Sequence, residues 1–355
     1  MIDWLSLSEI PCTHDPELLF NGMELVLDKD NNVILQKNIH KPVMGSHDNR
    51  VSIRTDIKSS MGRYVQISGN PSKFFQGHNL FGSNDVLALS QALIYRVLKE
   101  CCLSPDEQER GFIDGGLFKI TRVDITESWA MASRAQVKSV IRALSLYAEA
   151  TRRGRGELIK DGTVYWGRKS RYWTLKGYCK GDEIQVKNHT ISPEHPFFPQ
   201  LTQHADNLLR MELCLRGKQL KKLGLSYVAN WREGMPEKLY KDYLEKLTIP
   251  DRAAIPEDKF EGIPNRLMRA YSHWLNGDDV RRHYAKTTVY RHRRDLLDYG
   301  VDIFVMRGSE TDETNKSMLL LKPLFVSPTV LDPDWAKGTI CLFDPKADDS
   351  ADGAE

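Results

Sequence analysis

The sequence predicts an α+β protein in which an antiparallel sheet is flanked by helices and followed by a helical C-terminal part. Two segments, Phe118–Trp129 and Leu208–Arg216, alternate apolar and polar residues with the period of two expected of a half-buried strand. Strand-like and helix-like segments follow one another in mixed order, without the strict βαβ repetition of a parallel sheet. The 355 residues, 41% apolar and 28% charged, suffice for more than one globular domain.

The N-terminal half predicts hairpins, then two helices around a strand. Short apolar runs alternate with turn signals such as Asn21-Gly22 over the first sixty residues, as in antiparallel strands. Further on, the pattern predicts strands at Arg63–Gly69 and Phe118–Trp129, and helices at about Asn84–Cys102 and Arg134–Thr151. In Phe118–Trp129 one face carries Thr121, Val123 and Ile125, and the other carries Arg122, Asp124 and Thr126.

The C-terminal half predicts three more strands and then helices. The strands are expected at Gly162–Gly167, at Tyr172–Gln185 with a break at Gly181, and at Leu208–Arg216, where Arg210 and Glu212 face away from Met211 and Leu213. A charged helix is expected at about Glu237–Leu247, a linker at Ile249–Pro264, and helical structure at Arg266–Tyr299.

Positive charge is clustered in this chain. The net charge is only +2, but residues 344–355 carry −4, so the rest carries +6. Residues 152–180 hold nine Lys or Arg against two acids, and residues 281–294 hold six and no acid. Clustered positive charge suits phosphate binding, although either cluster alone could be a solvated surface.

Other features exclude several classes of protein. No apolar run is long enough for a membrane span, and the N-terminus lacks the layout of a signal peptide, so a cytoplasmic protein without a membrane partner is expected. The six cysteines form no C-x-x-C pair and are expected to be reduced. The chain also has no phosphate-binding G-x-x-x-x-G-K-[ST] loop.

One strand carries a candidate nucleophile. With a period of two, Lys176, Tyr178 and Lys180 share a face, so a lysine could lower the phenol's pKa or stabilise a phosphoryl transition state. If neighbouring strands bring Asp124 and Glu212 to the same face, their oxygens could hold a divalent cation. Each of these residues also has a purely structural interpretation. Tyr178 and its lysine could be an amphipathic pair on the surface of a strand, Asp124 could form a structural ion pair with Arg122, and Glu212 could only pair across strands.

Several sequence blocks resemble one family. They are residues 69–82 (GNPSKFFQGHNLFG), 121–124 (TRVD), 178–180 (YCK), Trp274 with Gly277, 288–294 (TVYRHRR) and 299–303 (YGVDI). Together they resemble the filamentous-phage replication initiators, the gene II/X family of phage and plasmid replication proteins, which is related to the HUH endonucleases. The resemblance spans roughly residues 60 to 305, and the first block is its most specific part.

The resemblance implies a rolling-circle replication initiator with an HUH-endonuclease-like sheet. Such a nickase and strand-transferase uses Mg²⁺ (or Mn²⁺). Its tyrosine, here Tyr178, attacks the origin and leaves a 5′-phosphotyrosine and a free 3′-hydroxyl. The displaced single strand is later resealed. The host helicase and polymerase are the expected partners, double-stranded origin DNA is the substrate, and the host bacterial cytoplasm is the expected location.

The same resemblance implies roles in phosphate stabilisation and metal binding for other residues. Lys180 is expected to stabilise phosphate or phenolate. No His-hydrophobic-His pair lies on a predicted strand, so Asp124 and Glu212 are the preferred metal ligands. His78 either joins them as a ligand or orders the turn around it. Alternatives to the enzyme are a non-catalytic DNA-binding repressor, for which Tyr178 would be dispensable, and a plasmid relaxase.

Two basic segments are candidates for DNA contacts. Arg168, Lys169 and Arg171 lie among aromatic residues that could stack exposed bases: Tyr165, Trp166, Tyr172 and Trp173, the last of which could equally pack beneath the sheet.

Further along, a helix at Leu267–Leu275 ended by Asn276-Gly277, and a second helix from Thr287 or Thr288 to Gly300, predict a helix-turn-helix. In the second helix Tyr290, Leu296 and Leu297 are expected to form the apolar side. Its arginines Arg291, Arg293 and Arg294 would read bases or only contact phosphates.

These expectations give three domains. Residues 1–225 are expected to form the nicking and strand-transfer catalytic domain. Residues 226–325 are expected to form a helical domain with the helix-turn-helix-like segment. Residues 326–355 are expected to be a C-terminal extension that ends in an acidic, disordered tail.

Overall fold

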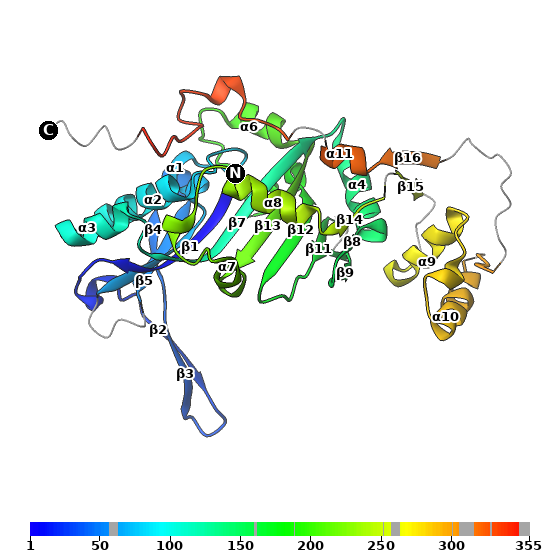
Figure 1. Cartoon of the computed structure of the whole chain (residues 1–355), viewed down its shortest axis with the longest axis horizontal. Coiled ribbons are helices and arrows are strands. Elements are labelled where there is room, and N and C mark those ends of the chain that lie inside the picture. Colours follow the sequence, from blue (N-terminus) through cyan, green and yellow to red (C-terminus); the bar gives the residue numbers. More distant parts are fainter. Residues whose placement is uncertain are drawn as a thin grey trace. The chain divides into compact units, whose positions relative to one another are not determined.

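The computed structural model describes residues 1–56, 63–159, 162–187, 189–250, 252–256, 263–299, 301–304, 316–326 and 329–347. The chain forms two compact units (Figure 1). Unit 1 comprises Met1–Arg134, Gly167–Lys246 and Thr329–Glu355, and unit 2 comprises Ala135–Trp166 and Leu247–Pro328. The units are discontinuous in sequence, so they differ from the contiguous ranges expected to end at residues 225 and 325.

Unit 1 is built on an antiparallel sheet, as predicted. Its strands run in the order β12-β13-β7-β1-β6-β5-β4, and each neighbouring pair is antiparallel. The strands are β1 (Ile2–Pro11), β4 (Lys41–Met44), β5 (Arg50–Thr55), β6 (Tyr64–Gly69), β7 (Lys119–Ala130), β12 (Trp173–Cys179) and β13 (Leu208–Arg216). The two strands with the clearest alternation, β7 and β13, lie side by side in this order.

The register of the sheet separates an apolar face from a polar one. On the apolar face Leu175 pairs with Leu213, which pairs with Ile125. Helix α8 (Met235–Leu244) covers this face (Figure 1), where Tyr240 contacts Trp129. This packing explains why residues after 225 belong to unit 1.

The opposite side, which we call the polar face, carries residues that are paired in three rows. They are Tyr178 with Arg210 and Ser128, Lys176 with Glu212 and Thr126, and Thr174 with Cys214, Asp124 and Trp4. The alternation in the sequence therefore predicted correctly that Tyr178, Asp124 and Glu212 share one face.

Strand β12 ends earlier than the sequence suggested. Its last residue is Cys179, and Lys180 begins the short helix α5 (Lys180–Glu183). A Cβ atom on Gly181 would lie 2.3 Å from the backbone oxygen of Asp206, so only glycine lets these two backbones approach so closely. The turn moves Lys180 off the strand and off the face of Tyr178.

Helices and the C-terminal residues enclose one end of unit 1. Helix α1 (Pro71–Gln76) is capped by the side chain of Asn70 and ends at Gly77, whose φ is +80°. The C-terminal segment, residues 329–347, packs against this region, with Phe343 stacked on Phe75 at 3.9 Å. Helices α2 (Val86–Glu100), α3 (Glu107–Asp114), α6 (Phe198–Ala205) and α7 (Gly217–Leu223) complete the unit.

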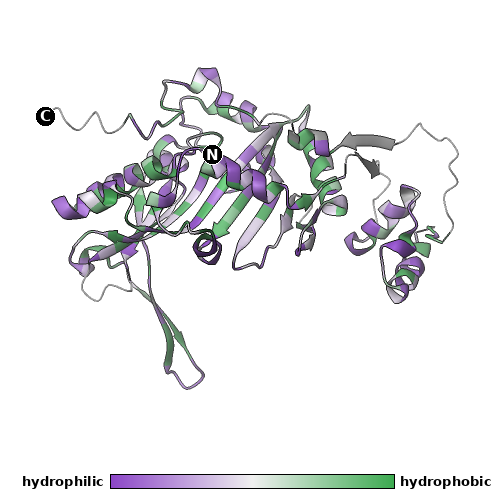
Figure 2. Ribbon diagram, viewed as in Figure 1, coloured by the Kyte–Doolittle hydropathy of each residue, from purple (hydrophilic) through white to green (hydrophobic). Residues whose placement is uncertain are grey.

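A hairpin of β2 (Met23–Leu27) and β3 (Val33–Asn38) extends away from the sheet of unit 1 (Figure 1). Both strands are rich in apolar residues (Figure 2). Seven of these have exposed side chains: Met23, Leu25, Val26, Leu27, Val33, Ile34 and Leu35. The hairpin therefore contributes little to the core of the unit.

Unit 2 contains helical and short sheet elements. They are α4 (Arg134–Tyr147), β8 (Glu149–Ala150), β9 (Gly154–Arg155), β10 (Glu157–Ile159), β11 (Thr163–Trp166), β14 (Leu247–Thr248), β15 (Arg252–Pro256), α9 (Asn265–Leu275), η4 (Val280–Arg282), α10 (Lys286–Leu297), β16 (Lys316–Leu320) and α11 (Lys322–Val326). Within the described ranges, every helix of the chain is too short or too polar to cross a bilayer.

Both helices predicted for this part of the chain are present, and α9 and α10 pack around a small core of their own. Of the three residues that the sequence assigned to the apolar side of α10, only Leu296 is buried. Val289, His292 and Leu296 are buried, whereas Tyr290 and Leu297 are 52% and 48% exposed. Spacings of three and four residues place the buried three on one helical stripe.

Candidate active site

Tyr178 lies near the end of β12 on the polar face, with only 7% of its surface exposed. Its hydroxyl donates to Oε2 of Glu212 at 3.5 Å. Burial raises the pKa of Tyr178 well above 10, and the charges of Glu212 and Glu183 raise it further. The phenol is therefore protonated at neutral pH and needs a proton acceptor before it can act as a nucleophile.

The lysine beside Tyr178 is Lys176. Its Nζ lies 2.9 Å from Oε2 of Glu212 and 5.1 Å from the centroid of the Tyr178 ring. Its side chain is 29% exposed, in contrast to the buried groups around it. A partly exposed ammonium group next to the phenol can pair with an incoming phosphate.

Glu212 is a buried carboxyl in a crowded charge environment. It is 4% exposed and sits on β13 opposite Lys176 and Thr126. Burial raises the pKa of Glu212 to about 8; Lys176 opposes this rise, and the nearby carboxylates of Asp124 and Asp3 add to it. Glu212 is thus positioned, and has a suitable pKa, to exchange a proton with Tyr178 near neutral pH.

Lys180 does not take the position predicted for it. It is fully buried, and its Nζ donates to Oδ1 of Asn79 at 2.8 Å and to Oε2 of Glu183 at 2.5 Å. Burial lowers the pKa of Lys180 to about 8, although Glu183 acts in the opposite direction. Because β12 ends at Cys179, Lys180 anchors the 77–82 loop through Asn79 instead of sharing a strand face with Tyr178.

Three further residues of this region were not identified as site residues from the sequence: Asp3, Asn79 and Arg210. Oδ1 of Asp3 accepts from Asn70 at 3.0 Å and from Asn79 at 2.7 Å. Burial alone would raise the pKa of Asp3, but Arg210, Lys180 and the Asn79 hydrogen bond together hold it below 3.8.

Arg210 ties this loop to the sheet. Its guanidinium donates to the backbone oxygens of Asn79 and Leu80 and, at 3.1 Å, to Ser128. Asn79 lies in the family-like block of residues 69–82, and Arg210 is expected on the same strand face as Glu212. The sequence therefore pointed to both residues. Asp3 had none.

Asp124 is held in an ion pair. Arg122 donates to both of its carboxylate oxygens, through Nε at 2.9 Å and through a second guanidinium nitrogen. Burial raises the pKa of the adjacent Cys214 thiol to about 12, with Asp124 contributing. Arg122 also lies over the ring of Trp4, 5.2 Å from its centroid. These contacts match the structural ion pair that was the alternative for Asp124.

His78 orders the loop that contains it. Its Nε2 pairs with the backbone oxygen of Cys341 at 2.9 Å, and its Nδ1 accepts from the backbone N–H of Leu80 at 3.3 Å. Burial lowers the pKa of His78 to about 3, so the ring is neutral. Both ring nitrogens are engaged, which leaves neither free for a metal ion.

The three predicted metal ligands do not form one ligand sphere. Among the described residues, the groups with three candidate ligand atoms close together are His78 with His195 and Cys341, and His273 with Asp278 and His283. Neither contains Asp124 or Glu212. Since Asp124 is paired with Arg122 and His78 is bound to its loop, the predicted set does not fit a shared Mg²⁺ ion.

Comparison with known proteins identifies the family. Residues 1–234 match the family model described as the N-terminal part of the gene II replication-associated protein. The chain is 30% identical over 309 residues to the replication-associated protein of Enterobacteria phage I2-2, covering 86% of this chain and 88% of that protein. The chain belongs to the family of gene II replication-associated proteins. The resemblance stated from the sequence motifs is confirmed.

Other members of this family match less closely. The replication-associated protein of Enterobacteria phage M13 is 27% identical over 175 residues, which is 45% of this chain and 42% of that protein. That of Salmonella phage IKe is 22% identical over 334 residues, covering 79% and 76%. A solved rolling circle replication initiator from Geobacillus stearothermophilus shares 15% identity over 74% of this chain and 89% of its own, with a TM-score of 0.30, too low to support a structural argument.

The first basic segment of this family member is an exposed turn. Arg168, Lys169 and Arg171 lie between the ends of β11 and β12 and are exposed, as is Tyr172. Trp173, however, is buried against Tyr243 at 5.1 Å. Of the other aromatic residues expected to stack on DNA, Trp166 is also buried and Tyr165 is half-buried.

The arginines of α10 differ from one another. Arg291 and Arg294 are exposed. Arg293 forms two hydrogen bonds of 2.7 Å with Asp302 and lies over the ring of Phe304, so its guanidinium stabilises the fold of unit 2. The exposed stripe of α10 consists of Lys286, Thr287, Tyr290, Arg291 and Arg294.

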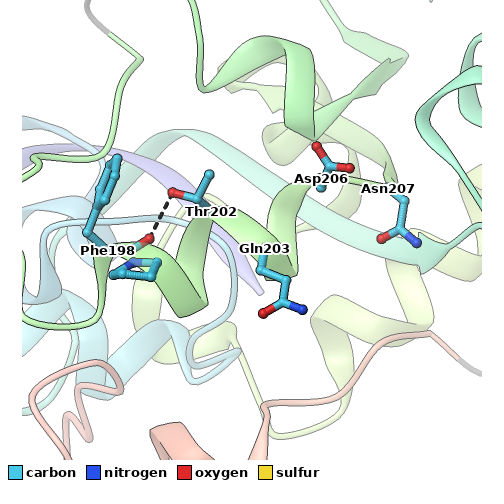
Figure 3. A pocket seen from close by; sticks show the side chains of 6 residues that line it. Phe198, Thr202, Gln203, Asp206 and Asn207 are labelled. Carbon is cyan, nitrogen blue, oxygen red and sulfur yellow. Dashed lines mark hydrogen bonds between the residues drawn. The ribbon is translucent and has the colours of Figure 1, made fainter.

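A shallow hollow of about 530 Å³ lies along α6 (Figure 3). Its walls are Phe198, Pro199, Thr202, Gln203, Asp206 and Asn207, and Thr202 donates within it to the backbone oxygen of Phe198 at 2.8 Å. None of the predicted site residues lines it. The candidate catalytic residues therefore lie on the polar face of the sheet and not in this hollow.

Proposed function

We propose that this member of the gene II replication-associated family initiates rolling-circle replication by nicking one strand of origin DNA through Tyr178 and later reseals the displaced strand. The observation that carries the proposal is the phenol of Tyr178 hydrogen-bonded to Glu212, a buried carboxyl whose pKa is about 8, with Lys176 beside both. A nucleophile, a proton acceptor and a cation thus meet on one sheet face.

The nicking step follows from these three side chains. The phenolic oxygen of Tyr178 attacks the scissile phosphorus while its proton passes to the ionised carboxylate of Glu212. The phosphorus–O3′ bond breaks, the 3′-oxygen takes a proton from solvent, and the 5′-phosphate remains on the tyrosine. Lys176 stabilises the negative charge on the non-bridging oxygens. Resealing is the reverse attack by a 3′-hydroxyl, so the bond energy is conserved and no ATP is consumed.

The DNA contacts are proposed on two surfaces. Within unit 1 the scissile single strand would follow the polar face, where the partly exposed Lys176, Arg122 and Trp4 offer charge and a ring for stacking. Within unit 2 the exposed stripe of α10 would contact the double-stranded origin. The free 3′-hydroxyl would be extended by the host polymerase behind a host helicase.

The test is nicking of a supercoiled plasmid that carries the cognate origin. Tyr178→Phe should abolish conversion to nicked circles while DNA binding is retained. Tyr240→Phe is the matched control, because its buried hydroxyl contacts the backbone of Met211 from the apolar side of the same sheet. Undiminished nicking by Tyr178→Phe would exclude this nucleophile. The predicted requirement for Mg²⁺ or Mn²⁺ is measured in the same assay by chelation and re-addition.

The exposed basic stripe of α10 also suits a non-catalytic DNA-binding repressor. The plasmid assay separates the two functions, since a repressor would bind the origin without nicking it. A plasmid relaxase would nick instead at a transfer origin, so the DNA that is cut distinguishes that function.

A further inference from the structure

Unit 2 contains a group of metal-ligating side chains that the proposed chemistry does not use. His273 lies near the end of α9, and Asp278 and His283 lie on either side of η4. One candidate ligand atom from each comes within 4.8 Å of the other two. Nδ1 of His273 is 3.2 Å from Oδ2 of Asp278, and Nε2 of His283 is 3.8 Å from the same oxygen.

The backbone fixes two of these side chains before any ligand binds. Helix α9 ends in a turn in which Gly277 has φ +79° and the N–H of Asp278 donates to the backbone oxygen of His273 at 2.9 Å. This C-terminal capping geometry needs a residue at positive φ, which glycine supplies. It returns the chain so that the carboxylate of Asp278 faces the imidazole of His273.

The third side chain is fixed by the next turn. The side chain of Asp279 caps η4 by accepting from the N–H of Arg281 at 3.0 Å. The N–H of His283 then donates to the backbone oxygen of Val280 at 3.1 Å, and Val280 is fully buried in the core of this unit. His283 is thus held beside His273, with the two rings 3.8 Å apart and nearly parallel.

The spacing suits a tetrahedral metal ion. Bonds of about 2.0–2.1 Å from zinc to imidazole nitrogen and carboxylate oxygen place neighbouring ligand atoms about 3.3 Å apart. The observed separations of 3.2 and 3.8 Å lie close to this value. His273 is buried, whereas His283 and Asp278 are partly exposed, so the His283 ring has room to turn out of its stack on His273 and direct Nε2 to the same ion.

We propose that His273, Asp278 and His283 bind one Zn²⁺ ion, with water as the fourth ligand. Two imidazoles and one carboxylate form a donor set that suits zinc better than magnesium, which prefers oxygen ligands. The ion would tie the end of α9 to the turn that leads into α10. Its effect on DNA binding rests on the proposed function of α10, whereas metal binding itself does not.

The test uses the full-length protein, stripped by a chelator and titrated with Co²⁺ as a spectroscopic probe. One equivalent should bind with the visible spectrum of a tetrahedral site, and Zn²⁺ should displace it. His283→Ala and Asp278→Asn should weaken binding at least about tenfold. His189→Ala is the matched control, because His189 also pairs with a carboxylate, Glu183, at 2.7 Å, and it lies outside the group. Its spectrum should be unchanged.

Two results would overturn the proposal: no tetrahedral Co²⁺ spectrum in the wild-type protein, or a spectrum that survives His283→Ala. Circular dichroism checks that each variant is folded. Binding of an origin duplex is a separate readout, expected to weaken when Zn²⁺ is removed from the wild-type protein but not from His283→Ala. A protein that binds Co²⁺ as expected but nicks no DNA would refute the nicking function and leave the metal site intact.

Discussion

The raised pKa of Glu212 predicts a measurable dependence of stability on pH. Glu212→Gln replaces the carboxyl by a neutral amide of nearly the same shape, so the variant cannot ionise at this position. In the wild-type protein the pKa of Glu212 is about 8 when folded, against an ordinary value of 4.5. The folded state thus binds this proton more tightly than the unfolded state does.

The size of the effect follows from that difference. The proton contributes its full stabilisation below pH 4.5, and the contribution is lost as the pH rises through 8. Within this window, each rise of one pH unit lowers the contribution of Glu212 to the free energy of unfolding by about 1.4 kcal/mol. Between pH 6 and pH 9 the wild-type protein should therefore lose about 2–3 kcal/mol of unfolding free energy through Glu212, and the Gln variant should lose none through this position.

The assay is urea unfolding of both proteins at pH 6 and pH 9, with EDTA present so that no cation replaces the proton. Other titrating groups affect both proteins alike, so the quantity to compare is the difference between them. The variant should gain about 2–3 kcal/mol relative to wild type over this range. Parallel pH dependences would show that Glu212 titrates normally, and the proton-acceptor role would lose its support.

Two matched pairs of substitutions test other parts of the structure. Gly181→Ala should lower the unfolding free energy by about 1–3 kcal/mol, because the new methyl meets the backbone of Asp206, whereas Gly111→Ala, in open space within α3, should raise it by about 0.5–1 kcal/mol. Arg291→Ala should weaken duplex binding and reduce its dependence on salt by about one phosphate contact, as measured by titration at several salt concentrations. Arg293→Ala should instead lower the thermal stability of unit 2 and leave that salt dependence unchanged.

The sequence predicted the sheet because strand faces are encoded locally. Alternation with a period of two places Tyr178, Glu212 and Asp124 on one side, and the pairing register preserves that side across β12, β13 and β7. What the sequence could not predict depends on contacts between distant segments. Strand β12 ends at Cys179 because of a backbone approach to Asp206, and residues after 225 belong to unit 1 because α8 covers its apolar face.

The candidate site was predicted only in part, because some of its residues follow from local strand patterns and others depend on contacts between distant segments. Tyr178 and Glu212 follow from strand parity, and the motif block pointed to the loop of His78 and Asn79. Asp3 was missed because it lies in an irregularity of β1, where the register against β7 shifts between Ile2 and Trp4. A bulge changes which residues face the site without leaving a pattern in the sequence.

Asn79 shows that the block of residues 69–82 positions the charged side chains around Tyr178 and does not itself supply the reacting groups. Its side-chain amide donates to Asp3 and accepts from Lys180, and its backbone oxygen accepts from Arg210, so this one residue joins β1, α5 and β13. His78 holds the same loop against Cys341. Buried charges are stable only when each is paired and hydrogen-bonded. This loop therefore fixes the charged residues around Tyr178, while the nucleophile and its proton acceptor come from the strands.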